Sequence, residues 1–160
     1  MKNISKNNKT KSPTISIISP SLNLGRFLEP TIQSILNQSY TDYEHIVVDG
    51  GSTDNTLPIL KKYPNIRWIS EKDSGYQDAL IKGMKMARGK YIMICMVSAG
   101  YVHKDWFLRF IEAFEQNLEI SLVWGFPNWM TENGTLGKLF LPQFKFINPH
   151  KTSRCLTYWM

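Results

Sequence analysis

Short hydrophobic runs alternate along this chain with stretches in which apolar residues recur every three or four positions. Five runs rich in β-branched or aromatic residues predict strands at 14–19, 44–49, 65–70, 91–97 and 120–124. Helical spacing predicts four amphipathic helices at 26–37, 54–63, 76–87 and 104–115. Strands that alternate with helices in this way predict an α/β fold with a mostly parallel, Rossmann-like sheet and helices on both faces.

The same pattern predicts where the elements end and which side chains they bury. Pro20 is expected to break the first strand, since proline cannot donate to a sheet ladder. The run 91–97 is apolar throughout and is expected to be a buried strand. Two helices are expected to bury apolar stripes made of Leu28, Ile32, Ile35 and Leu36, and of Leu80, Met84 and Ala87.

The sequence changes character after Gly125, and three segments are expected. Residues 1–12 predict a disordered basic leader, residues 13–125 the main domain, and residues 126–160 a short extension. Asn133-Gly134 is typical of a hairpin turn. The extension is rich in aromatic residues, so it is expected to pack on something, such as a second copy or another protein.

The net charge of +6 does not predict nucleic-acid binding, because of where the charge lies. Four lysines in residues 1–12 and four basic residues in 133–160 carry +8 without any acid, so residues 13–132 carry −2. The leader could at most attract the chain to an anionic membrane surface. With no long apolar run and no secretory signal, the expected place is the cytoplasm, peripheral at the inner membrane face at most.

The stretch 45–56 carries the candidate chemistry. An apolar run ends on Asp49, Gly50 and Gly51 turn the chain, and Ser52-Thr53-Asp54 offer caps to a helix. A buried parallel strand of this kind delivers a carboxylate to the edge of the sheet, where open α/β sheets bind ligands. Cys95, in another predicted strand, is expected to be a small buried hydrophobe.

Four segments in this order resemble the family-2 glycosyltransferases, which have a GT-A fold. They are 19–23 (Ser-Pro-Ser-Leu-Asn), 48–56, 70–75 (Ser-Glu-Lys-Asp-Ser-Gly) and Asp78-Ala79 followed by Lys82-Gly83. The resemblance covers residues 13–125 and implies transfer of a sugar from a nucleotide-diphosphate sugar, commonly a UDP-sugar. The implied acceptor is a glycan or a lipid-linked glycan, as in polysaccharide biosynthesis.

The resemblance also implies a donor site. Asp49 would accept a hydrogen bond from the base imide, and Lys82 would face phosphate or lie on the helix surface. Asp54 is either a helix cap or a ligand contact. Asp78 is either a ligand contact or an acid that the helix dipole favours in the first turn of a helix. The remaining positions would border the base, the nucleoside or the sugar: Pro20, Ser21, Asn23, Ser70, Asp73 and Gly75.

Two departures from the family pattern concern catalysis. The family commonly places acids for Mn²⁺ or Mg²⁺ after its fourth strand, where this chain has Ser98 and Ala99, so no metal ligand is assigned. Arg26, Lys82, His103 and Lys104 are the cations that could replace a metal. No catalytic base is assigned, because Glu132 is the only acid after Glu119, and His150 is either a base or a loop histidine. An inactive or truncated member that binds nucleotide or serves as a partner module is therefore the alternative to an enzyme.

Overall fold

The computed structural model describes residues 2–3, 12–117, 119, 121–124 and 145–147. The chain divides into two compact units, residues 1–105 and 106–160. The predicted boundary between 125 and 126 lies at the start of a range that is not described, so this boundary stays a prediction. The predicted Asn133-Gly134 hairpin and nearly all of the aromatic extension also lie outside the described residues.

The first unit is built on a five-stranded sheet with the order β1-β4-β3-β2-β5. Its strands are β1 (Lys2–Asn3), β2 (Ile15–Ser21), β3 (Tyr43–Asp49), β4 (Arg67–Ser70) and β5 (Tyr91–Ile94). Strands β2 to β5 are mutually parallel, and the two-residue β1 pairs antiparallel with β4. The predicted mostly parallel sheet is confirmed.

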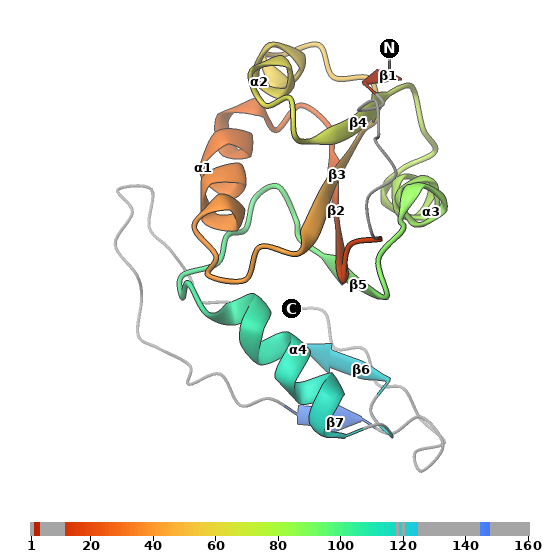
Figure 1. Ribbon diagram of the computed structural model, residues 1–160. Helices are drawn as coiled ribbons and strands as arrows, with labels where there is room; N and C mark the ends of the chain where they lie inside the picture. Colours follow the sequence, from red (N-terminus) through yellow and green to blue (C-terminus); the bar gives the residue numbers. More distant parts are fainter. Residues whose placement is uncertain (1, 4–11, 118, 120, 125–144, 148–160) are drawn as a thin grey trace. The chain divides into compact units, whose positions relative to one another are not determined.

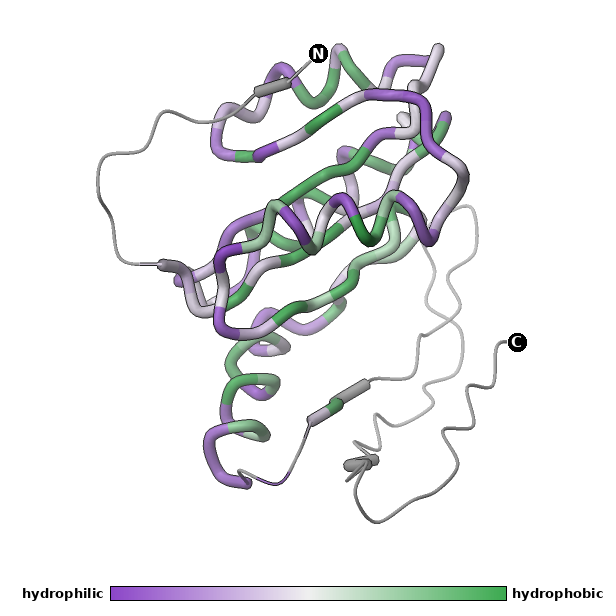
Figure 2. The backbone as a smooth tube through the Cα atoms, turned by 90° about the vertical axis from the view of Figure 1, so that its right-hand side faces the viewer, coloured by the Kyte–Doolittle hydropathy of each residue, from purple (hydrophilic) through white to green (hydrophobic). Residues whose placement is uncertain are grey.

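Helices cover both faces of this sheet, as predicted (Figure 1). They are α1 (Gly25–Leu36), α2 (Thr56–Lys62) and α3 (Tyr76–Met86). Val47 and Trp68 join the core under α1 and α2, whereas Ile46 and Val48 pack with Ala79 of α3. The central strands are correspondingly hydrophobic along their length, while the helices alternate in hydropathy (Figure 2).

Pro20 does not end the first strand, contrary to the prediction. β2 continues to Ser21, and Pro20 pairs with Val48 of β3. Cys95 N donates to Ile18 O, so the backbone N–H and C=O groups of Ile18 point toward β5. Residues two apart in a strand point their backbone groups to the same side, so Pro20 also faces β5 and not β3. Because β5 ends at Ile94, opposite Ile18, the missing N–H of Pro20 costs no ladder bond.

Three of the burial predictions are wrong. Leu36 is 48% exposed although Leu28, Ile32 and Ile35 are buried, and Met84 is also 48% exposed. α3 instead buries Ala79 and Gly83. The helix lies so close to the sheet that a Cβ on Gly83 would be 2.4 Å from Ile18 Cγ2, so only small side chains fit on the helix face that contacts the sheet. β5 lies at the edge, so Ile92 and Ile94 are exposed while Met93 is buried.

The second unit contains α4 (Trp106–Gln116), β6 (Leu122–Trp124) and β7 (Lys145–Ile147). α4 confirms the fourth predicted helix, with Phe107 and Phe110 buried. The fifth predicted strand does not join the parallel sheet: β6 pairs antiparallel with β7 in a separate two-stranded sheet. No helix among the described residues is long and apolar enough to cross a membrane.

Candidate functional site

Asp49 ends β3 with a carboxylate that is completely buried. One oxygen accepts from Gly51 N at 3.2 Å, Ser52 N at 3.0 Å and Ser70 Oγ at 2.6 Å, and the other accepts from Ser52 Oγ. A carboxylate offers about four acceptor positions, and this one has four donors. Asp49 therefore holds the turn after β3 and ties it to the end of β4.

The turn after β3 is also tied to the loop after β2. Asn23 N donates to Ser52 Oγ at 2.7 Å, and Thr53 N donates to Asn23 Oδ1 at 2.9 Å. Asn23 has a φ of 53°, a conformation that asparagine tolerates better than most residues. The loops after β2 and β3 thus form one hydrogen-bonded unit at the carboxyl edge of the sheet.

Asp54 has the structural role that the sequence analysis weighed against ligand contact. Oδ1 accepts from Thr56 N at 2.9 Å and Oδ2 from Gly25 N at 2.8 Å. Thr56 begins α2 and Gly25 begins α1, so one carboxylate satisfies free N–H groups at two helix starts. The hydrogen bond from the Thr56 hydroxyl contributes most to lowering the pKa of Asp54.

Asp73, in the loop after β4, lies against Gly50. Oδ1 accepts from Gly75 N at 2.9 Å. A Cβ on Gly50 would lie 2.9 Å from Asp73 Oδ2, so the carboxylate takes the place that a side chain at position 50 would need. Gly75 precedes α3 with a φ of 111°, which glycine adopts without strain. The residue pattern gave no signal of the contact between Gly50 and Asp73.

Lys82 of α3 is held between two acids rather than left free. Its Nζ lies 3.2 Å from Glu71 Oε1 and 3.3 Å from Asp78 Oδ2. Asp78 also accepts from Ser74 N at 3.1 Å, so it stabilises the start of α3, as its place in the first turn indicated. These contacts fasten the 71–75 loop to α3 and neutralise Lys82, whose predicted phosphate contact stays a prediction.

Ser21 leaves an unpaired polar atom at this edge. Its Oγ is buried and has no hydrogen-bond partner among the described residues. The residue pairs with Asp49 across β2 and β3. Because buried hydroxyls nearly always have a partner, a ligand or a water molecule is expected here. Pro20 precedes Ser21 in the strand and is buried.

His45 is a buried titratable residue to which the sequence analysis gave no role. Its Nε2 lies 2.9 Å from Ser19 Oγ, and burial lowers the pKa of His45 to about 4. The imidazole is therefore neutral at pH 7. Its 4% exposure leaves it within the core between β2 and β3, so it bonds the two strands rather than a ligand.

The segment with Ser98 and Ala99 does not fit a divalent cation. Both residues are exposed, and the Thr31 hydroxyl lies 2.5 Å from Val97 O and 2.7 Å from Ala99 O. Within the described part of the chain, no three His, Cys, Asp or Glu side chains are placed to hold a metal. A hydroxyl and a methyl cannot replace carboxylate ligands of Mg²⁺ or Mn²⁺.

Comparison with known proteins decides the family. The sequence pattern of glycosyl transferase family 2 matches residues 16–158. The chain belongs to glycosyl transferase family 2. Among family relatives, TuaG of Bacillus subtilis, named for teichuronic acid biosynthesis, is 38% identical over 91% of this chain. Chondroitin synthase of Escherichia coli is 32% identical over 70% of the chain.

Solved structures confirm the GT-A fold expected from the family 2 resemblance. A mannosyltransferase from Pyrobaculum calidifontis, solved with GDP-Man and Mn²⁺, matches with a TM-score of 0.63 and 22% identity over 69% of this chain and 34% of that one. S. aureus TarS 1–349, solved with UDP-GlcNAc, gives a TM-score of 0.56 and 25% identity over 64% and 31%.

This family 2 chain spans only part of its relatives. It covers 56% of the B. subtilis protein and 17% of the E. coli protein. Mn²⁺ accompanies the nucleotide in the P. calidifontis structure and in a glucosyl-3-phosphoglycerate synthase from Mycobacterium tuberculosis. In this chain, Ser98 and Ala99 supply no carboxylate for such an ion.

Proposed function

We propose that this chain binds a nucleoside-diphosphate sugar, specifically a UDP-sugar, and serves its transfer to a glycan or lipid-linked acceptor. The observation that carries the proposal is the joined set of loops at the carboxyl edge of β2, β3 and β4 in a family 2 chain. Asp49, Asn23 and Asp54 fix these loops by hydrogen bonds. Fixed loops lower the entropic cost of ordering a donor.

Individual residues at this edge have roles that suit a nucleotide. The buried, unpaired Ser21 Oγ can donate to or accept from a ligand atom. Gly50 and Gly51 allow close approach of the backbone, and the 71–75 loop presents Asp73 beside them. Solved relatives with this fold carry UDP, UDP-GlcNAc or GDP-Man, which supports a nucleotide at the same edge.

The transfer itself breaks the bond between the sugar C1 and the diphosphate oxygen and joins C1 to an acceptor oxygen. The acceptor proton must pass to a base. Glu132 and His150 lie outside the described residues, so no base is assigned. We derive no step through a metal, because Ser98 and Ala99 supply no carboxylate.

Calorimetric titration of UDP into the 160-residue chain, in Mn²⁺ and in EDTA, tests the proposal. We expect the same affinity in both buffers, because none of the residues proposed to bind the nucleotide acts through a metal ion. Binding only with Mn²⁺ would contradict metal-independent donor binding. Absence of binding in both buffers would refute the donor site altogether.

The second proposal is that the chain binds a nucleotide, or serves as a partner module, without catalysing transfer. One observation favours it: Ser98 and Ala99 stand where metal-binding acids are expected. Release of UDP from a panel of UDP-sugars in EDTA separates the two proposals. Turnover would exclude the inactive module. UDP binding with no turnover, in EDTA or in Mn²⁺ and with glycan acceptors present, would support it.

A further inference from the structure

The geometry points to Asp73, and not Asp49, as the carboxylate that recognises the base, and it favours uracil. This inference rests on the proposed donor site and specifies how the base is read. It assigns Asp73 Oδ2 as the acceptor of the uracil N3–H. Two observations carry it: the state of the Asp49 carboxylate and the position of the Asp73 carboxylate over Gly50.

Asp49 is not accessible to a base, because the residue is completely buried. Its side chain is 0% exposed, and four donors from Gly51, Ser52 and Ser70 occupy its oxygens. For a base to bond Asp49, one of these internal bonds would have to break inside a buried site. Leaving a buried donor unsatisfied is costly, so a base would gain little there.

Asp73 differs from Asp49 in two ways: the residue is not fully buried, and one of its oxygens accepts no hydrogen bond from the described residues. The residue is partly exposed, and only Oδ1 is engaged, by Gly75 N. Oδ2 accepts no hydrogen bond from the described residues and lies 2.9 Å from the position that a Cβ on residue 50 would take. The absence of a side chain at Gly50 therefore lets the loop after β4 place a carboxylate at the end of β3.

The number of free oxygens discriminates between bases. Uracil presents one N–H donor, N3–H, between two carbonyl oxygens, so one free carboxylate oxygen is enough. Guanine presents N1–H and the 2-amino group side by side and is best matched by two carboxylate oxygens. Gly75 N, at 2.9 Å, takes one of the two acceptor positions of Oδ1, so Oδ2 is the oxygen of Asp73 with both positions open, and this single open oxygen suits the one N–H of uracil.

The variant Asp73→Asn tests the inference through base preference. Its carbonyl can keep the bond from Gly75 N, while its NH₂ group replaces Oδ2 and faces the base as a donor. Uracil N3–H is then opposed by a second donor, whereas cytosine N3 is an acceptor. We expect UDP affinity to fall by about ten- to a hundredfold, as for loss of a bond to a charged group, and CDP affinity to rise relative to UDP.

Asp78→Asn is the matched control, because Asp78 also bonds the 71–75 loop, through Ser74 N, but does not face Gly50. Its ratio of UDP to CDP affinity should equal that of the unaltered chain. A role of Asp73 limited to the loop turn would weaken both nucleotides equally, and that result would overturn the inference. Tighter binding of GDP than of UDP by the unaltered chain would also overturn it.

The outcomes separate this inference from the proposed function. If the unaltered chain binds UDP and Asp73→Asn leaves the preference unchanged, the donor site stands and the role of Asp73 falls. If the unaltered chain binds no nucleotide, the proposed function fails and the inference fails with it.

Discussion

At the scale of single residues, two aspartates at one edge of the sheet have different surroundings. Asp49 is buried under four donors, whereas Asp73 is partly exposed with one donor. From the sequence alone, both are candidate ligand-binding acids, because Asp49 ends one predicted strand and Asp73 lies in the loop after another. Burial separates them: the first carboxylate stabilises the loop, and the second is the one that we propose for the base.

Substituting Asp49→Asn should lower stability without changing base preference. The amide keeps one acceptor oxygen, but it loses the negative charge that four donors share and sets an NH₂ group in place of the other oxygen, at a cost of about 1–3 kcal/mol. Urea unfolding measures this change. Asp73→Asn keeps the acceptor for Gly75 N and should cost clearly less. Equal losses of stability in the two variants would contradict the assigned roles.

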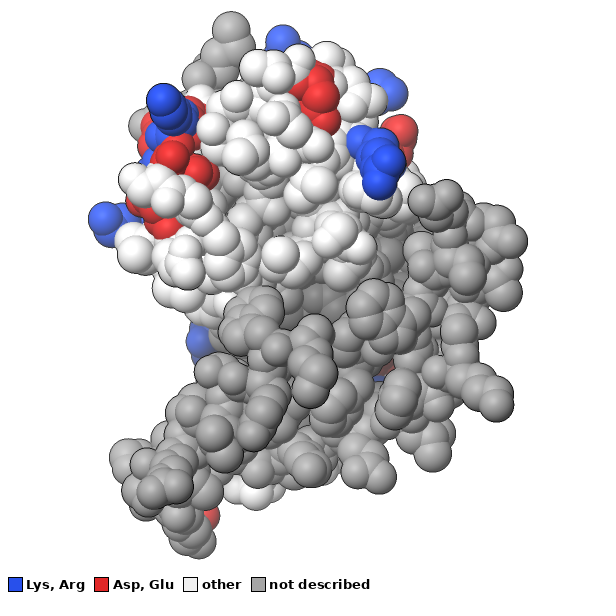
Figure 3. Space-filling model, turned by 180° about the vertical axis from the view of Figure 1, so that it is seen from behind, with Lys and Arg blue, Asp and Glu red and all other residues white. Residues whose placement is uncertain are grey.

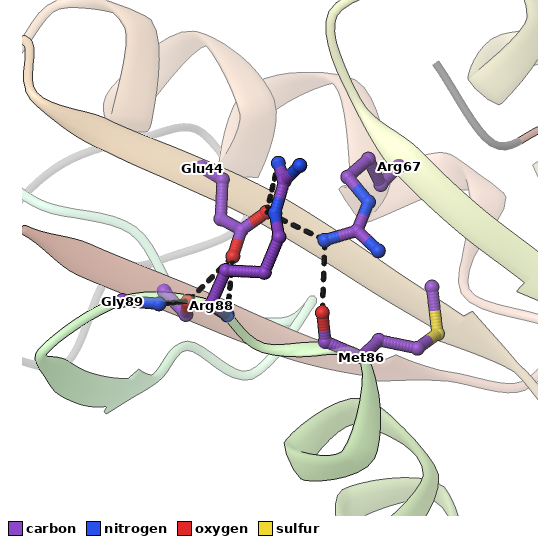
Figure 4. A network of polar contacts seen from close by, with 6 residues as sticks. Glu44, Arg67, Met86, Arg88 and Gly89 are labelled. Atoms are coloured by element: carbon purple, nitrogen blue, oxygen red, sulfur yellow. Dashed lines mark hydrogen bonds and ion pairs between the residues drawn. The ribbon is translucent and has the colours of Figure 1, made fainter. Parts of the chain in front are cut away.

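At the scale of secondary-structure elements, the opposite edge of the sheet is held by a buried ionic network (Figure 4). Glu44 of β3 accepts from Ser16 Oγ of β2 at 2.7 Å, Arg67 Nη1 of β4 at 2.6 Å and Arg88 Nη2 at 2.7 Å. Arg88 N also donates to Glu44, and Gly89 N to Ser16 Oγ. The network joins three strands to the turn between α3 and β5, so it aligns the elements that carry the site.

This network predicts a pH-dependent stability. Burial raises the pKa of Glu44, and the hydrogen bonds from Arg88, Ser16 and Arg67 outweigh it, so the pKa is lowered in the folded chain. A lowered folded pKa adds stability above the unfolded value of about 4.3. That stability is lost as the pH falls through the folded pKa.

Glu44→Gln should therefore destabilise the chain at pH 7 by about 3 kcal/mol, because it leaves two arginines without their acid. The loss should be smaller at pH 3 than at pH 7, because the stability that comes from the lowered pKa of Glu44 declines as the pH falls below the unfolded value. Chemical unfolding at both pH values measures it. Glu29→Gln is the control. Its ion-pair partner Lys62 is 3.9 Å away and 62% exposed, and the amide oxygen can keep the hydrogen bond from the Tyr63 hydroxyl, so about 0–1 kcal/mol is expected. A loss for Glu44→Gln that stays constant with pH would contradict this linkage.

At the scale of the whole molecule, the described donor-site residues all lie in the first compact unit. This holds for the edge built from Ser21, Asp49 and Ser70 and for the loop with Asp73. On the face shown in Figure 3, basic and acidic side chains are interspersed and no continuous basic surface forms among the described residues. The part of this face that the structure describes therefore offers no continuous basic surface for a nucleic-acid backbone.

UDP binding should therefore slow backbone hydrogen exchange in some segments of the chain and not in others. We expect hydrogen exchange to slow at residues 50–53 and 71–75, which surround the proposed base site, and to stay unchanged in α4. Exchange followed by mass spectrometry, with and without UDP, measures this in the full chain. Protection confined to α4 would place the nucleotide elsewhere.

The sequence by itself determined the family and the order of strands and helices from β2 to β6, whereas β1 and β7 were not predicted. Periodicity reports local burial, and the segments at 19–23, 48–56 and 70–75 combine residue types that few families share, so both could be read without coordinates. The sequence also indicated the roles of Asp54 and Asp78, because a helix cap or a first-turn acid bonds backbone N–H groups only a few residues away in the chain.

Tertiary structure decided whatever depends on residues far apart in the chain. Pro20 stays in a strand because β5 ends early, and Leu36 and Met84 are exposed because nothing in the first unit covers them at those positions. β6 pairs with β7, since a short apolar run carries no information about its partner. The contact of Asp73 with Gly50 joins two loops that follow neighbouring strands, and only the packed sheet brings them together.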